Sequence, residues 1–296
     1  MRGQQDAVRG VGPVLFPHTA SRAPPPSPGL RVTWRKLRTL FEVHFAEMTE
    51  YRAEIMIWML SSTLSLVMML VWMAQAAAAP GGQIRGYGPQ EFAGYFLATW
   101  VVSQLLVVWV AWDLDLDIRQ GTLSPKLLRP LDPLWLRYMD HLAGRIVRLP
   151  ALLALAALFA WITGARFSTD PAAYLASLGL AFLGFNTRFL WEYVIGLLAF
   201  WTESSTSFQE VMWLVYAALG GMFAPLAFYP EWVQSVAVWT PFPYMLGLPA
   251  QLLAGQATLS DAGRGALVLL VWLAVFWALR LVVWRRGLWK YGAVGA

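Results

Sequence analysis

The chain contains no cysteine, few charged residues and no phosphate-binding loop. Of its 296 residues only 13% are charged, whereas 58% are hydrophobic. Without cysteine the protein has no disulfide, no thiolate nucleophile and no cysteine-ligated metal site. The pattern G-x-x-x-x-G-K-[ST], which holds nucleotide phosphates, is also missing, so we expect no cofactor bound by this chain.

Apolar and aromatic side chains are abundant instead. With 17 Trp, 16 Phe and 11 Met, the chain is too apolar for an ordinary water-soluble domain. A helix that crosses a bilayer needs about 17–25 mostly apolar residues. Six windows of this kind predict an all-α polytopic membrane protein with six transmembrane helices. They cover approximately 55–79, 92–112, 146–164, 173–200, 211–228 and 265–284.

Lysine and arginine are distributed unevenly over the connecting segments. If the amino terminus is inside, the inner flanks 31–54, 113–148 and 285–296 hold five, six and three basic residues, whereas the outer loops hold three. Such a bias places the basic flanks in the cytosol, so both termini are expected there. The net charge of +5 is explained in this way, and no nucleic-acid partner is expected. Arg280, near the inner end of the last span, is expected to extend its side chain toward the interface.

The amino-terminal part divides into two segments. Residues 1–30 are expected to be a disordered tail ahead of one membrane domain, 31–296. Residues 31–53 place apolar side chains at spacings of three and four, with charged residues on the other faces, which predicts an amphipathic helix on the inner membrane surface. A soluble helix packed on another domain is the alternative. The apolar positions are Trp34, Leu37, Phe41 and Phe45.

The inner segment 113–145 is too long for a simple connection. It opens with DLDLD, but Ile118 and Ser124 replace the glycine and the glutamate that a calcium loop requires, so no metal site is expected. On a helix Asp113 and Asp117 share one face, and the glycine and prolines that follow predict a compact helix-turn-helix below the membrane. It is interpreted as the part that a separate energy-supplying subunit holds, the alternative being a solvated tether. The apolar side chains that favour a docked partner are Leu123, Leu127, Leu128, Leu131, Leu134 and Trp135.

The outer segment 229–262 contains four prolines and too few consecutive apolar residues to cross the membrane. It is expected to dip into the outer leaflet as two short broken helices, where protein or trapped water must satisfy its amides. The alternative is a surface loop with interfacial aromatic residues.

Three polar residues, Asn186, Arg188 and Glu192, fall within the fourth predicted span. Charges at this depth are costly and seldom occur without a role. Arg188 and Glu192 are four residues apart and can neutralise each other, either as a structural pair or facing a cavity. If they face a cavity, replacing both with leucine should leave assembly intact and reduce transport.

Three blocks of sequence resemble the integral-membrane permease subunits of type-2 ABC exporters, in particular a short bacterial subfamily. They read AWDLDLDIRQGTLSPKLLRPLDP, FYPEWVQSVAVWTPFPYMLGLPAQLLAG and WRRGLWKYGAVGA. The resemblance covers about residues 31–296. It implies a six-span half-transporter in the bacterial inner membrane that pairs with a second permease, identical or related, and with two ATP-binding subunits that carry ATP and Mg.

In that family the amphipathic amino-terminal helix and the first inner loop contact the ATPase, and broken helices before the last span line the outer exit. The resemblance therefore implies two sets of site residues. For ATPase coupling these are Asp117, Arg119, Gly121, Leu123, Ser124, Pro125, Leu128, Arg129 and Pro130. Asp113 is included with them because it lies on the same helical face as Asp117. For the outer gate they are Pro230, Glu231, Trp232, Pro241, Pro243 and Tyr244.

Two other classes of membrane protein remain as alternatives. An intramembrane enzyme needs a buried histidine, a serine–histidine couple or paired aspartates, but the three histidines His18, His44 and His141 all fall in cytosolic segments. A secondary transporter or channel often contains inverted repeats, and the two halves of this chain show none. A permease that exports an amphipathic, drug-like, lipid or glycan substrate is therefore favoured, and no catalytic residue is expected.

Overall fold

The computed structural model describes residues 34–50, 63–203 and 205–294, and every regular element in these ranges is helical. One isolated bridge joins Ile84 and Tyr87, and the described residues contain no other β-structure. The all-helical prediction is therefore confirmed. The expected tail 1–30 and the first residues of the first predicted span lie outside the described residues.

The helices follow one another with short connections. In chain order they are α1 (Trp34–Glu50), α3 (Leu64–Ala78), η1 (Pro80–Gly82), α4 (Pro89–Leu106), α5 (Val110–Arg119), α6 (Leu123–Leu127), α7 (Pro133–Thr163), α8 (Pro171–Leu197), η2 (Leu198–Phe200), α9 (Thr206–Leu219), η3 (Leu226–Phe228), α10 (Glu231–Ala237), η4 (Pro243–Gly247), α11 (Leu248–Leu253) and α12 (Leu259–Val294).

Three helical stretches of the described residues are long and apolar enough to cross a membrane by length and composition. They are Pro89–Arg119, Pro133–Thr163 and Leu259–Tyr291. Leu64–Ala78 is a shorter apolar helix, and α8 is 27 residues long but contains an internal ion pair. The number of six spans stays a prediction.

The second predicted span, 92–112, is not one continuous helix. α4 ends at Leu106 and α5 begins at Val110, because Val107 leaves the helical region with φ −58° and ψ 126°. The interruption contains neither proline nor glycine, the two residues that disfavour a helix interior most strongly. Side chains of α7, described below, form hydrogen bonds with three backbone groups at the break.

The fifth predicted span, 211–228, is also not one helix. α9 has 14 residues, which at about 1.5 Å per residue extend about 21 Å, less than a bilayer core of about 30 Å. The helix ends because the chain reverses at Gly221, whose φ of +89° favours glycine. The Tyr95 hydroxyl donates to the Gly221 carbonyl at 2.8 Å. The prediction that this window forms a single helix is therefore wrong.

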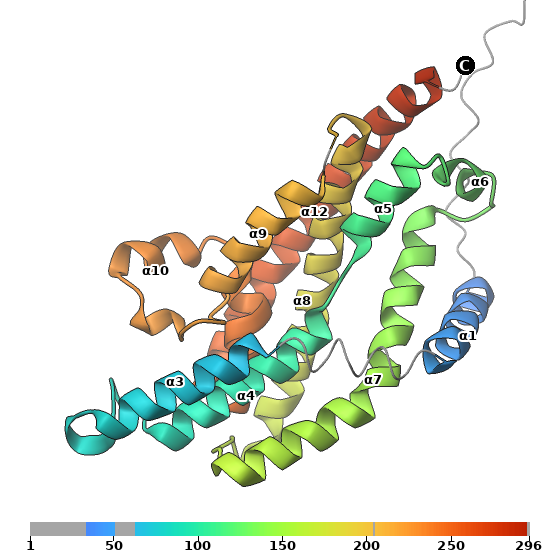
Figure 1. Ribbon diagram of the computed structural model, residues 1–296. Coiled ribbons are helices and arrows are strands. Elements are labelled where there is room, and N and C mark those ends of the chain that lie inside the picture. The colour runs from blue at the N-terminus through green and yellow to red at the C-terminus, as the bar shows by residue number, and fades with distance from the viewer. Residues whose placement is uncertain (1–33, 51–62, 204, 295–296) are drawn as a thin grey trace, which may run out of the picture.

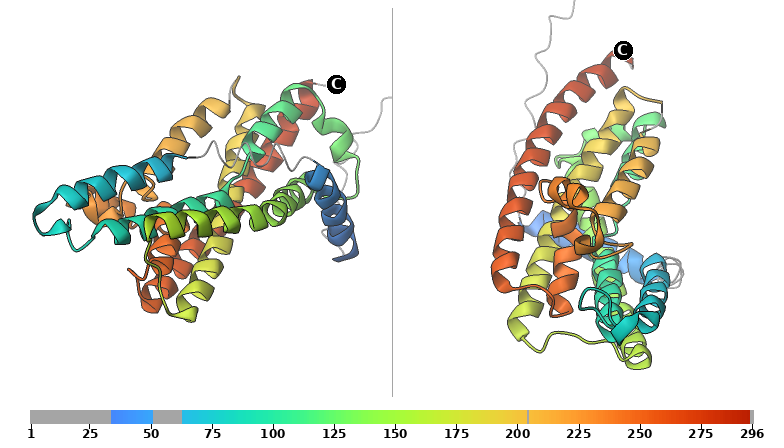
Figure 2. Two further views of the ribbon diagram at one scale, coloured as in Figure 1. Left: turned by 60° about the horizontal axis from the view of Figure 1, so that its bottom comes forward. Right: turned by 90° about the vertical axis from the view of Figure 1, so that its left-hand side faces the viewer.

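α8 lies at the centre of the molecule, and α12 packs along much of its length (Figures 1 and 2). α5 and α11 also pack on α8, and together these helices enclose the larger apolar core. A second core lies between α3, α4 and the carboxyl-terminal half of α7. α7 changes direction partway, and Pro150 stands inside this helix where it removes a backbone donor.

The two ends of the molecule carry different segments. α5, α6 and the carboxyl-terminal end of α12 gather at the upper right of Figure 1, whereas the turn between α3 and α4 lies at the lower left. α1 packs along α7 beside the first of these ends. The segments that were predicted to face the cytosol are therefore grouped together in space.

Candidate functional site

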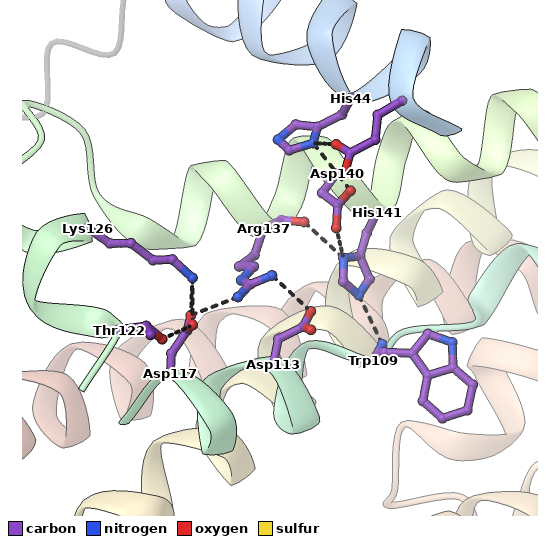
Figure 3. Close-up of polar contacts among 10 residues, drawn as sticks. His44, Trp109, Asp113, Asp117, Thr122, Lys126, Arg137, Asp140 and His141 are labelled. Atoms are coloured by element: carbon purple, nitrogen blue, oxygen red, sulfur yellow. Dashed lines mark hydrogen bonds and ion pairs between the residues drawn. The ribbon is translucent and has the colours of Figure 1, made fainter. Parts of the chain in front are cut away.

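The carboxylate of Asp117, near the end of α5, is the centre of the inner segment (Figure 3). It accepts bonds of 2.6 Å from the Lys126 ammonium, 2.7 Å from the Arg137 guanidinium and 2.9 Å from the Thr122 hydroxyl. The donors belong to α6, to α7 and to the turn before α6. Hydrogen bonds between charged partners are stronger than neutral ones. One buried carboxylate therefore fastens the helix-turn-helix to α7.

The neighbouring aspartates hold α5 from two sides. Asp113, one turn before Asp117, lies 3.4 Å from the same guanidinium. Asp115 points away from them, pairs with Arg119 at 2.7 Å and accepts from the backbone N–H and hydroxyl of Ser205 at 3.1 and 2.6 Å. This is the division of faces that helical spacing predicts. α5 is thus tied to α7 on one face and to the start of α9 on the other.

Asp132 fixes the beginning of α7. One of its oxygens accepts from the Leu134 N–H at 2.9 Å, which caps the helix, and Pro133 occupies the first helical position. The other oxygen accepts from Arg280 of α12. Arg280 is buried, with its guanidinium 5.5 Å from the ring centre of Trp284. The expectation that it extends toward the interface is wrong, because a carboxylate partner is available inside the protein.

The outer surface of α6 and its flanking turns is less apolar than its leucine content suggests. Leu123 and Leu134 are fully buried, whereas Leu128 is 87% exposed. The expectation of six apolar side chains on a docking surface is therefore wrong, because the segment folds back on α5 and α7. The three remaining members, Leu127, Leu131 and Trp135, are half-buried.

The remaining residues of the expected coupling set lie at the surface. Gly121 adopts φ +73°, which reverses the chain after α5. The Ser124 and Tyr291 hydroxyls are 3.0 Å apart, so α6 also touches the end of α12. The exposed members are Arg119, Gly121, Ser124, Pro125, Leu128, Arg129 and Pro130.

One group of possible metal ligands lies beside this cluster. The ligand atoms of Asp113, Asp140 and His141 are within 4.8 Å of one another. Each already has protein partners: Asp113 faces Arg137, Asp140 lies 3.4 Å from the His44 ring, and both ring nitrogens of His141 contact backbone groups. The group therefore gives no support for a bound cation.

Comparison with known proteins identifies the family of this chain. The family described as ABC-2 family transporter protein matches residues 54–295, which is more than half of the chain. The chain belongs to the ABC-2 family of transporter proteins. No curated protein and no solved structure gives a significant match. The family match confirms the resemblance seen in the sequence and makes the protein a membrane-embedded transport component.

In this ABC-2 transporter the charged pair of the fourth predicted span is buried against α9. Arg188 donates to Glu192 at 2.9 Å, and the second Glu192 oxygen accepts from Gln209 at 3.2 Å. The Arg188 guanidinium lies 4.4 Å from the ring centre of Tyr216. Because both charges contact α9, the geometry favours the structural pairing over a pair that lines a cavity.

Asn186 instead lines a cavity of about 370 Å³ between α7, α8 and α12. Its side-chain oxygen accepts from the Tyr138 hydroxyl at 2.9 Å. The other walls are mostly apolar and aromatic, including Phe189 and Trp277. A cavity of this size falls within the range of about 300–1,000 Å³ that small ligands occupy.

The expected outer-gate residues divide between two environments. Pro230, Glu231 and Trp232 begin the short helix α10, where Trp232 is 71% exposed. Pro243 is buried in η4, and the Tyr244 hydroxyl donates to the Val238 carbonyl at 3.1 Å. In the turn between α3 and α4, burial against the rings of Phe92 and Phe228 raises the pKa of the Tyr87 hydroxyl. Pro241 lies in the turn between α10 and η4.

The expected interfacial helix is α1. Its side facing α7 carries His44, which lies 3.4 Å from Asp140, and Leu37 and Phe41 are half-buried. Trp34 and Phe45 are exposed. The described helix thus has one face on the protein and apolar residues left outside, while its position in the membrane surface stays a prediction.

Sequence reasoning missed four residues of this region: Lys126, Arg137, His141 and Arg145. Three of them carried a usable signal, since Arg137, His141 and Arg145 recur every four residues and therefore share one face of α7. Lys126 gave no such signal, because its pairing with Asp117 depends on how the turn folds.

Proposed function

We propose that this ABC-2 transporter is the permease subunit of an ATP-driven exporter in the bacterial inner membrane, with both termini in the cytosol. Two separate ATP-binding subunits would supply energy and carry ATP and Mg, and a second permease would complete the pathway. Family membership supports the permease role. The coupling role is supported by one observation: the carboxylate of Asp117 in α5 is hydrogen-bonded to α6, to the turn before α6 and to α7, so that these elements are held together.

The exposed residues of α6 and its following turn form the proposed docking surface, comprising Ser124, Pro125, Leu128, Arg129 and Pro130. Leu128 is the one large aliphatic side chain among these five residues, and it is 87% exposed. Because the segment is braced by α7 and by Tyr291 of α12, a partner that moves α6 also displaces these helices. This connection converts closure of the ATPase into movement of membrane helices.

For the substrate we propose an amphipathic molecule of drug, lipid or glycan type. The cavity between α7, α8 and α12 supports this class, because aromatic and aliphatic walls surround one hydrogen-bonded polar pair, Tyr138 and Asn186. A secondary transporter or channel would instead move solute without an ATPase.

Replacing Leu128 with serine tests the docking surface. The ABC-type ATP-binding subunits encoded by the source cell are co-expressed with this chain one at a time. The partner is the subunit that copurifies with the chain from detergent-solubilised membranes. We expect L128S to reduce recovery of the ATPase several-fold, since the variant loses the apolar contact without losing any internal one. Leu116→Ser is the matched control, because Leu116 is exposed on α5. Equal recovery with both variants, or transport by the purified chain without an ATPase, contradicts the proposal.

A further inference from the structure

Three side chains on one face of α7 lie against the interrupted second span. Arg137, His141 and Arg145 are spaced by four residues, and we call them the α7 stripe. Arg137 contacts α5, His141 contacts the break at residues 107–109, and Arg145 contacts the end of α4. The stripe therefore spans both sides of the interruption.

Arg145 satisfies the carbonyl groups at the end of α4. Its guanidinium donates to the carbonyls of Leu105 at 2.6 Å and Val107 at 2.5 Å, and also to that of His141. The last carbonyls of a helix have no partner within the helix, and leaving them unpaired is costly inside a bilayer. The guanidinium lies 3.7 Å from the ring centre of Phe185 and is buried, so its position is fixed.

His141 satisfies the beginning of α5. Its Nε2 accepts from the backbone N–H of Trp109 at 2.9 Å, and its Nδ1 lies 3.0 Å from the Arg137 carbonyl. The tautomer with the proton on Nδ1 meets both contacts, because Nδ1 then donates and Nε2 accepts. The two ends of the broken span are thus held by residues one helical turn apart on α7.

We propose that Arg145 and His141 are positioning residues for energy coupling. Their hydrogen bonds to both sides of the break keep α4, α5 and α7 in a fixed relative orientation, so that the three helices move together. We call this set of contacts the splint. Without the splint, a force on α6 would bend the chain at residues 107–109 and leave α4 in place. The source of the force rests on the proposed function above. The splint itself does not, because all of its contacts lie within this chain.

Distances between spin labels test the splint directly. The chain has no cysteine, so Gln90→Cys at the start of α4 and Gln120→Cys after α5 give one labelled pair without background. Both glutamines are exposed. We expect one narrow distance distribution for the full chain in lipid nanodiscs, and a broad or shifted distribution for H141L/R145M.

Two variants control this measurement. R148M removes an arginine from the next turn of α7. The Nε of Arg148 donates to the Gly144 carbonyl of its own helix, so this variant should keep the narrow distribution. H141Q retains an acceptor for the Trp109 N–H and should also keep it. Where the double variant does not fold, H141L alone is measured. A narrow, unshifted distribution in H141L or in H141L/R145M overturns the proposal.

Coupling is then measured with the complete transporter in proteoliposomes. H141L and R145M should continue to hydrolyse ATP while transporting several-fold less substrate for each ATP, and H141Q and R148M should match the unchanged protein. An unaltered ratio in H141L and R145M overturns the role in coupling. Failure to find any ATPase partner contradicts the proposed function. It does not contradict the rigid connection of α4, α5 and α7, which is tested separately by the distance measurement.

Discussion

At the scale of single residues, each buried charge in the described part of the chain has a hydrogen-bonding or ionic partner. Within the described residues the carboxylates of Asp115, Asp117 and Glu192 all accept from cationic or polar donors. Arg145 donates to backbone carbonyls, and Arg280 pairs with Asp132. Because an unpaired charge inside a protein is far more costly than a paired one, these contacts restrict how the helices fit together.

The buried pair of α8 gives a prediction about stability. Glu192→Leu leaves Arg188 buried without its anion and should lower the free energy of unfolding by about 3–5 kcal/mol. Arg188→Leu/Glu192→Leu removes both charges and should cost markedly less. The unfolding temperature of each variant is measured in detergent, with size-exclusion chromatography after heating as the readout of the folded fraction. A double variant that is less stable than E192L contradicts the pairing.

At the scale of elements, glycines let helices approach α8 closely. A Cβ added at Gly196 would lie 2.9 Å from Ala111 Cα and 2.9 Å from Leu114 Cβ, which are both in α5. At Gly179, in the amino-terminal half of the same helix, an added Cβ meets nothing within 4 Å. The close contact between α5 and α8 therefore requires glycine at position 196, whereas a side chain at position 179 has room.

Alanine substitutions at these two positions form a matched pair. Gly196→Ala should push α5 away from α8 and destabilise the protein by about 1–3 kcal/mol, the usual cost of overpacking. Gly179→Ala should leave stability unchanged or raise it, because alanine favours helix. Thermal unfolding in detergent compares them. If G196A unfolds at the same temperature as G179A, the close approach of the two helices is not required.

At the scale of the whole molecule, the proposed inner segments lie together and away from the turn between α3 and α4. This arrangement agrees with the basic residues of the inner flanks, which sequence alone assigned to the cytosol. The orientation leads to a labelling prediction, since an impermeant reagent distinguishes the two sides of a membrane.

Two exposed glutamines provide the labelling sites, Gln83 before α4 and Gln120 after α5. In intact cells, an impermeant maleimide should modify Gln83→Cys and leave Gln120→Cys unmodified. In inside-out vesicles the pattern should reverse. Modification of Gln120→Cys in intact cells would show that the proposed orientation is incorrect.

Sequence reasoning succeeded where the signal is local and failed where it depends on distant partners. Helical class and the opposite faces of Asp113 and Asp115 follow from composition and periodicity. The break after Leu106 does not, because Val107 and its neighbours contain no helix-breaking residue and Arg145 lies about forty residues further along the chain. Apolar windows therefore predicted a straight helix that the structure interrupts.

The sequence by itself determined that this is an all-helical membrane protein of the ABC-2 transporter family, because hydrophobicity, basic flanks and family motifs are properties of the linear chain. Only the tertiary structure decided that Leu128 remains outside while Leu123 is buried, that Arg280 meets Asp132, and that α9 ends early. The reason is physical: burial and the pairing of charges depend on contacts between side chains that are far apart in the chain, and a local segment of sequence does not specify which distant residue it will contact.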